Sequence, residues 1–236
     1  MNLPVGIALQ SVAFPLFFSV VGLALVRRRG LDAAVMIGAW WLAYFWMVGF
    51  PDWPPIKALD WAGLLAALSA TISSRMSGHC LLWGQALLFA VAPFVLGWPL
   101  IAHQPSVGLL VELAGMAVIG VLTVVWIAKN PVRRHTSVLL INAAGLAIAS
   151  SLTGSLLIGE LAAALASCLG GWLLYDITWR RKSPRDDSSI KHTVPVALLL
   201  LALFLNARLY ADLPMIVLGC LLIIPLIVLL PTWRDA

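Results

Sequence analysis

Residues 193–211 read TVPVALLLLALFLNARLYA, a stretch whose one charged side chain, Arg208, lies near its end. A helix needs about 20 mostly apolar residues to cross the hydrocarbon core of a bilayer. Backbone polar groups in hydrocarbon must find partners within the protein, so an apolar run of this length is predicted to be a transmembrane helix.

Similar apolar runs fill most of the chain, and turn-forming residues separate them. The tightest break is at Gly159-Glu160. We therefore predict an all-α, polytopic integral membrane helix bundle of about nine transmembrane helices, in a single transmembrane domain that spans 1–236. The predicted helices are 5–26, 32–50, 57–74, 80–101, 107–128, 137–158, 161–179, 193–211 and 214–231.

The composition indicates that lipid is the main solvent of this chain. Its 236 residues are 62% hydrophobic and 11% charged, whereas an average soluble domain carries roughly 25% charged residues. The net charge of +5 does not point to nucleic acid, because the basic residues lie in short clusters between apolar runs. We expect membrane lipids as partners and no nucleic acid.

The basic clusters predict the orientation in the membrane. With nine crossings, thirteen of the fifteen Lys and Arg residues fall on one side, and only Lys57 and Arg208 fall on the other. Cytoplasmic loops carry the excess of Lys and Arg. The N-terminus is therefore predicted outside and the C-terminus in the cytoplasm of a cell (inner or plasma) membrane. The absence of Asn-x-Ser/Thr sequons fits a bacterial protein.

A weak parallel duplication is also suggested by the spacing of arginines. Arg28 and Arg134 are 106 positions apart, as are Arg75 and Arg181. This spacing would make 1–105 and 106–212 parallel halves, with 214–231 as an additional helix. The alternative is that regular helix length alone spaces the basic loops.

Small residues recur every four positions in three of the runs, and such rows let helix backbones approach closely in lipid. In the run 137–158, the hydroxyl groups of Ser150, Ser151, Thr153 and Ser155 could also line a polar path. Alternatively, these hydroxyls bond to their own helix backbone. The three rows are Ala62, Ala66, Ala70 and Ser74; Ala143, Ala147, Ser151 and Ser155; and Ala162, Ala166 and Gly170.

Polar residues within the apolar runs are the candidate functional residues, because charge inside a bilayer is costly. Glu112 and Arg208 both fall in the predicted outer half, so we expect an ion pair with Asn206 beside it as a substrate or proton site. The alternative is that both charged side chains reach out to the interface. Gln85 and Asn142 are expected to bridge helices by hydrogen bonding.

Motifs for catalysis, metal binding or cofactor binding are not found, so we expect no metal and no cofactor and favour a protein that is not an enzyme. The first functional hypothesis is a small permease or exporter of a small solute. The second is a non-catalytic structural or assembly subunit that has other membrane protein subunits as partners. The third is a membrane-embedded lipid-modifying enzyme. A central cavity lined by Glu112, Asn206 and the hydroxyl groups of the run 137–158 would favour transport. A closed bundle with a flat exposed apolar or small-residue face would favour a subunit. A cavity open sideways to lipid, with paired polar residues, would favour an enzyme.

Overall fold

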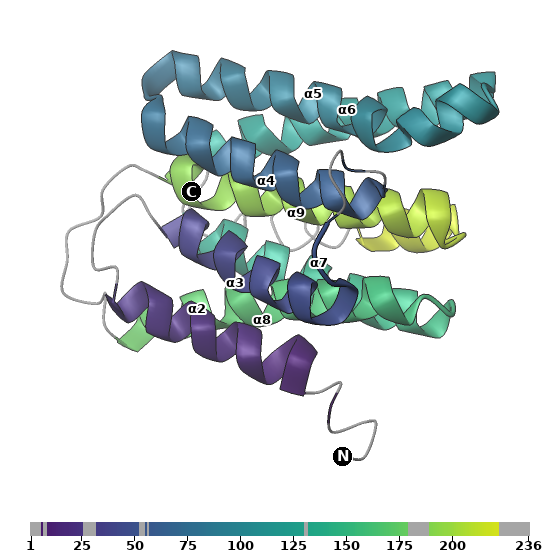
Figure 1. The fold of residues 1–236 in the computed structure, drawn as a ribbon. Coiled ribbons are helices and arrows are strands. Elements are labelled where there is room, and N and C mark those ends of the chain that lie inside the picture. The colour runs from purple at the N-terminus through teal and green to yellow at the C-terminus, as the bar shows by residue number, and fades with distance from the viewer. Residues whose placement is uncertain are drawn as a thin grey trace, which may run out of the picture.

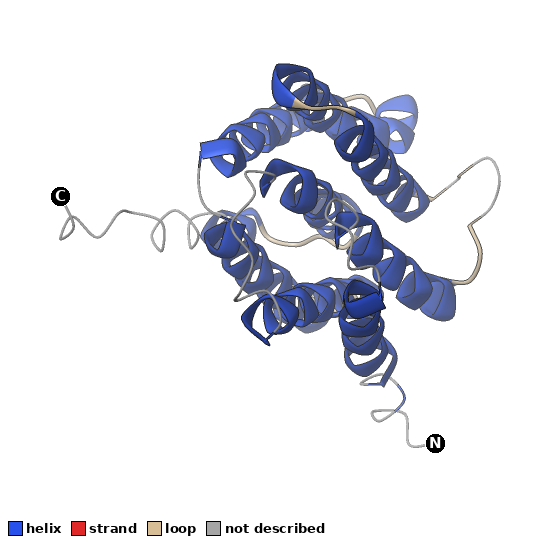
Figure 2. Cartoon of the chain, turned by 90° about the vertical axis from the view of Figure 1, so that its left-hand side faces the viewer, coloured by secondary structure: helices blue, strands red, loops and turns tan. Residues whose placement is uncertain are grey.

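All elements of the described chain are helices in the computed structural model (Figure 2). The structure describes Gly6, Pro55 and residues 9–25, 32–51, 57–129, 132–178 and 189–221. Helical residues 215–221 begin the last predicted run, whose remainder lies outside the described residues. The helices are η1 (Leu9–Ala13, a π-helix), α2 (Phe14–Leu25), α3 (Asp32–Val48), α4 (Ala58–Arg75), α5 (Gly78–His103), α6 (Val107–Lys129), α7 (Val132–Leu152), α8 (Leu156–Thr178) and α9 (Ser189–Tyr210).

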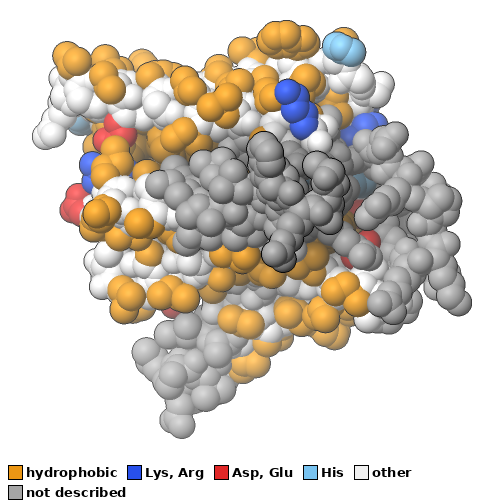
Figure 3. Space-filling model, turned by 180° about the vertical axis from the view of Figure 1, so that it is seen from behind, with side chains coloured by type: hydrophobic (Ala, Val, Ile, Leu, Met, Phe, Trp, Pro, Cys, Tyr) orange, Lys and Arg blue, Asp and Glu red, His pale blue; other side chains and the backbone are white. Residues whose placement is uncertain are grey.

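Length and composition make this a multi-pass membrane protein. Five stretches within α5–α9 are long and apolar enough to cross a bilayer, and two shorter apolar stretches, Leu9–Leu25 and Asp32–Val48, precede them. Large apolar side chains are exposed along the helices, for example Phe17, Trp83 and Ile148. Apolar side chains also cover much of the visible face in Figure 3, as contact with lipid requires.

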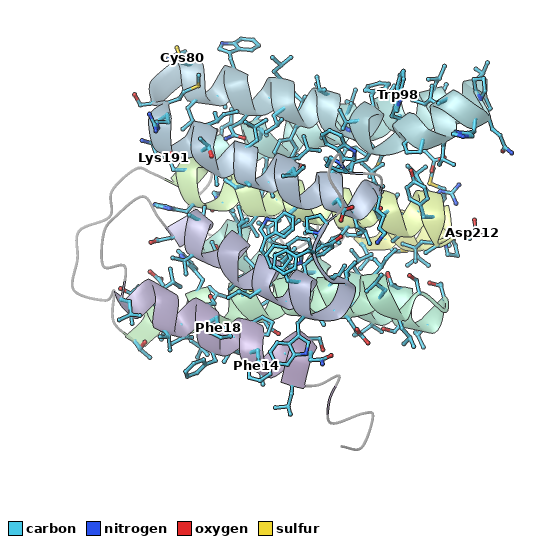
Figure 4. The ribbon with its side chains drawn as sticks, viewed as in Figure 1. Phe14, Phe18, Cys80, Trp98, Lys191 and Asp212 are labelled. Carbon is cyan, nitrogen blue, oxygen red and sulfur yellow. The ribbon has the colours of Figure 1, made fainter. Side chains whose placement is uncertain are left out.

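The helices lie side by side, and successive helices from α2 to α9 run in opposite directions (Figure 1). We call the end where α4, α6 and α8 begin the Asp60 end, and the opposite end the Lys191 end. Trp98 and Asp212 mark the first and Cys80 and Lys191 the second (Figure 4). Which end faces the cytoplasm remains a prediction, because the clusters Arg27–Arg29 and 180–185 lie outside the described residues. The duplication also remains a prediction.

Helix α9 occupies the centre of the bundle. It contacts every helix from α3 to α8, and in Figure 1 it runs between the α5–α6 pair and the lower layer of α3, α7 and α8. Within the apolar stretch that is long enough to cross a membrane, 83% of α9 is buried inside the protein, whereas the corresponding share in α6 is 28%. From Val196 to Leu205 its side chains are buried and apolar. The axis of the described bundle is therefore filled by apolar side chains.

The small residues of α8 allow two close helix contacts. A Cβ on Gly171 would lie 3.2 Å from the Leu16 carbonyl oxygen of α2. Ser19 donates a hydrogen bond of 2.9 Å to the Cys168 carbonyl oxygen across the same contact. On another side of α8, a Cβ on Gly159 would lie 3.0 Å from the Ala147 carbonyl oxygen of α7. Small residues thus set the spacing of α8 from both neighbours.

The predicted break at Gly159-Glu160 is wrong. The chain turns at 153–155 instead, where Gly154 has a φ of +95°, a conformation that glycine adopts without steric cost. Both Gly159 and Glu160 lie within α8. Gly159 was predicted as a turn residue, whereas its small size serves the contact with α7.

Replacing Gly159 by alanine is expected to destabilise the protein by about 1–3 kcal/mol, because the new methyl group meets the backbone of α7. Gly115→Ala in α6 is the matched control, since nothing lies within 4 Å of its Cβ position. This control should be neutral or stabilise by up to about 1 kcal/mol, because alanine favours a helix over glycine. Thermal unfolding in detergent measures both effects, and equal shifts would contradict the proposed contact.

Candidate functional site

An ion pair joins α6 to α9 at the Asp60 end. Arg208 Nε lies 2.5 Å from Glu112 Oε1, and the two side chains keep 28% and 16% of their exposure. Arg208 also donates a hydrogen bond of 3.2 Å to the Leu213 carbonyl oxygen beyond the end of α9. The ion pair expected from the sequence is therefore present, and it is only partly buried.

Asn206 is buried in α9, and its side chain bonds to its own helix. Its Nδ2 donates a hydrogen bond of 2.8 Å to the Ala202 carbonyl oxygen one turn earlier. An asparagine whose amide bonds to its own helix backbone does not need a ligand to complete its hydrogen bonding. Its expected role beside Glu112 and Arg208 remains a prediction.

A second polar contact at this end joins α3 to α4, and it was not predicted from the sequence. Tyr44 donates a hydrogen bond to Asp60 Oδ1, and both side chains are at least 99% buried. The other oxygen, Asp60 Oδ2, is buried without a hydrogen-bond partner among the described residues. A buried carboxylate in this condition is unusual, because desolvation disfavours its charge.

Two tryptophan rings pack against the ring of Tyr44, whose hydroxyl group binds Asp60. The Tyr44 ring lies 5.4 Å from the Trp40 ring and 5.2 Å from the Trp41 ring, measured between centroids. Trp40 is fixed by a hydrogen bond of 3.1 Å from its Nε1 to the Leu161 carbonyl oxygen of α8. Trp41 lies over Gly63, where a Cβ would clash with its ring. Gly63 follows Asp60 by one turn of α4, so the carboxylate and the rings belong to one cluster.

The hydroxyl groups proposed for a polar path are gathered at the α7–α8 turn. Ser151 and Thr153 are exposed and bond to the Ala147 and Ala149 carbonyl oxygens of the preceding helical turn, at 2.8 and 3.1 Å. Ser155 precedes α8 and is not part of α7, contrary to the predicted run 137–158. For Ser151 and Thr153 this geometry matches backbone satisfaction, the alternative that the sequence left open. Ser150 is instead buried, and its Oγ has no hydrogen-bond partner among the described residues.

Gln85 bridges α5 to α4, as expected. Ser69 Oγ donates to Gln85 Oε1 at 2.7 Å, and Gln85 Nε2 donates to the Ser69 carbonyl oxygen and to Ser73 Oγ, both at 2.9 Å. All three side chains are buried. Both ends of the amide are therefore satisfied within the helix pair.

Gln85→Leu is expected to lower stability by about 1–2 kcal/mol, because three hydrogen bonds between α4 and α5 are lost within lipid. The matched control is Gln104→Leu, at an exposed position after α5, which should change the unfolding temperature little. Thermal unfolding of both variants tests this. If both variants have the same stability as the parent protein, the bridge contributes nothing.

The bridging role expected for Asn142 is not seen. Asn142 is buried in α7, and its Oδ1 has no hydrogen-bond partner in the described part of the chain. Its neighbours one turn away on the buried face, Leu139 and Leu146, are apolar. The sequence shows a polar side chain in a helix but does not show whether a donor lies opposite it.

Buried polar residues also lie at the Lys191 end. His192 Nδ1 of α9 lies 3.8 Å from Asp32 Oδ2 of α3, and the His135 ring makes an edge contact with Trp126 at 4.9 Å. Within the described ranges, no group of three or more His, Cys, Asp or Glu could hold a metal ion. Central helix α9 is thus held by an acid–base pair near each end, to α3 at one and to α6 at the other.

The charged side chains of the candidate contacts lie near the ends of the described bundle and not at its mid-depth. Asp60, Glu112 and Arg208 all lie within two turns of a helix terminus, while the centre of α9 is apolar. The strongest candidate site is therefore the pair of contacts Tyr44–Asp60 and Glu112–Arg208 at the Asp60 end. Comparison of the chain with protein-family models, with curated proteins and with solved structures finds no match.

Proposed function

We propose that the protein is a small permease for a polar solute, with its binding site at the Asp60 end. The observation that carries the proposal is Asp60, which is 1% exposed and whose Oδ2 has no partner in the described structure. A buried charge without a counter-ion lowers stability. Ionisable residues inside a membrane commonly mark substrate or ion pathways. Helix packing leaves Asp60 Oδ2 without a partner, and a bound solute would supply one.

The ion pair Glu112–Arg208 supports the proposal because it lies at the same end and is partly exposed. A solute that arrives from this end would reach Glu112 and Arg208 without crossing the apolar centre of the bundle. Helix α9 carries Arg208 and packs against α4, which carries Asp60. Movement of α9 would therefore be coupled to both contacts.

The apolar centre of α9 is compatible with a carrier that is closed between its two ends. Alternating access requires that a solute site open to one side is sealed from the other. In this proposal, the packed stretch from Val196 to Leu205 is the seal.

Counterflow in proteoliposomes tests the function even though the solute is unidentified. Purified protein is reconstituted with an unlabelled panel of amines, amino acids, sugars and organic anions inside, and uptake of each labelled compound is measured. We expect at least one compound to accumulate above protein-free liposomes, and Asp60→Asn to remove that accumulation. Accumulation that is unaffected by Asp60→Asn, or no accumulation of any compound, would contradict a permease with this site.

The second candidate is a non-conducting subunit of a larger membrane complex. The closed, apolar centre of the described bundle favours it, since α9 is buried against six helices and its middle is apolar. Co-purification in mild detergent from the native membrane distinguishes the two functions. A stable stoichiometric partner, together with no counterflow, would favour the subunit.

A further inference from the structure

We propose that Asp60 and the aromatic side chains around Tyr44 bind an ammonium group, so that the solute is a small amine or alkylammonium ion. This inference rests on the proposed permease function for its biological meaning, but binding can be measured without transport. Its starting point is the unpartnered oxygen of a carboxylate that is 1% exposed. An acceptor-only group of this kind is completed by a donor or a cation.

Among the described residues, the Lys and Arg side chains at this end do not supply that cation. Arg208 is taken by Glu112 at 2.5 Å and by the Leu213 carbonyl oxygen at 3.2 Å. Lys57, three positions before Asp60, is exposed, and the contact that it makes with Asp60 is through its backbone carbonyl oxygen, at 3.1 Å from Asp60 N. The charge of Asp60 is therefore left for a ligand to balance.

The aromatic rings favour an ammonium group over a hydrated metal ion. Trp40 and Trp41 flank Tyr44 at 5.4 and 5.2 Å, and the Trp41 ring also lies 4.9 Å from the Phe45 ring. Ring faces attract cations, tryptophan most strongly, and clusters of such rings recognise methylated ammonium groups. A metal ion would need several oxygen ligands, whereas the side-chain oxygens in this cluster come from one carboxylate and one phenol.

Of the two tryptophans in the cluster, Trp41 is the one that borders the surface. Trp40 and Tyr44 are fully buried, and Trp41 is only partly buried. Its ring lies over the turn of α4 that follows Asp60. A ligand that reaches Asp60 from this side would therefore contact Trp41 first, and Trp41 is the aromatic residue to test.

The test is a thermal-shift titration of the purified full chain in detergent with methylammonium and with choline. The neutral isostere of choline, 3,3-dimethyl-1-butanol, and potassium chloride at equal concentration are the ligand controls. We expect at least one ammonium compound to raise the unfolding temperature saturably, and neither control to do so. Asp60→Asn should weaken binding at least about tenfold, since a charge-assisted contact is lost. Trp41→Leu should weaken it about three- to tenfold.

Asp212→Asn is the matched variant, because Asp212 is exposed at the same end and outside the cluster. It should bind like the parent protein. Trp41→Leu keeps the carboxylate and so tests the site even where Asp60→Asn folds poorly. Equal stabilisation by potassium chloride, or binding that survives both Asp60→Asn and Trp41→Leu, would overturn the inference.

The two proposals fail in different ways. Ammonium binding without counterflow of any compound would support the ligand site and contradict the permease function. Asp60-dependent counterflow of a sugar or an anion, without ammonium binding, would keep the permease and overturn the ligand class.

Discussion

Asp60→Asn is expected to abolish solute accumulation in proteoliposomes while it raises the unfolding temperature. The amide has the same size as the carboxylate and still accepts the hydrogen bond from Tyr44, but it carries no charge to be desolvated within the bundle. We expect a gain of about 1 kcal/mol, which corresponds to about 2–4 °C for a chain of this size. Counterflow and thermal unfolding of one preparation measure both changes.

The opposite signs of these two effects separate a functional from a structural carboxylate. If Asp60 only holds α3 to α4, its loss should reduce stability and uptake together. Asp212→Asn changes an exposed carboxylate at the same end and should alter neither quantity. A drop in unfolding temperature for Asp60→Asn with proportionate loss of uptake would reject the functional interpretation.

Glu112→Ala is expected to reduce uptake far more than it reduces the yield of folded protein. The change removes the carboxylate from Arg208 and leaves its hydrogen bond to the Leu213 carbonyl oxygen. Loss of a charge-assisted hydrogen bond, worth about 1.5–3 kcal/mol, corresponds to roughly ten- to hundredfold in solute binding. Because both side chains are partly exposed, solvent screens the pair, and we expect folded yield to change by less than about twofold.

Glu160→Ala is the matched control for this experiment. Glu160 is the fifth residue of α8 and Glu112 the sixth of α6, and both helices begin at the same end of the bundle. Glu160 is outside the candidate site, so its loss should leave uptake unchanged. Fluorescence-detected size exclusion gives the folded yield, and an equal fall in yield and uptake for Glu112→Ala would make the ion pair structural.

Most helices were predictable because a segment that crosses lipid must be a long run of apolar residues. A run such as 193–211 is apolar on nearly all faces, and a helix hides the backbone of such a run in hydrocarbon. The turn at 153–155 was missed because glycine has two uses in a membrane protein. It permits a positive φ at Gly154 and a close helix contact at Gly159, and composition alone does not tell one from the other.

The candidate site was only half predictable. Glu112 and Arg208 stand out because each interrupts an apolar run. Asp60 lies in the first turn of α4, where an exposed interfacial carboxylate is equally compatible with the sequence. It is buried beside Tyr44 from α3, and the helix that carries it packs against α9, more than 120 positions further along the chain. Contacts of that range are not encoded in any local pattern.

The central position of α9 has a consequence for synthesis. The helices α2 to α8 leave the ribosome before α9, although six of them pack against it in the finished protein. Until α9 arrives, the early helices must wait in the membrane with their inner faces filled by lipid or by a chaperone. A nascent chain stopped before residue 189 should therefore insert but remain open to proteolysis, and resistance should appear only when α9 has been made.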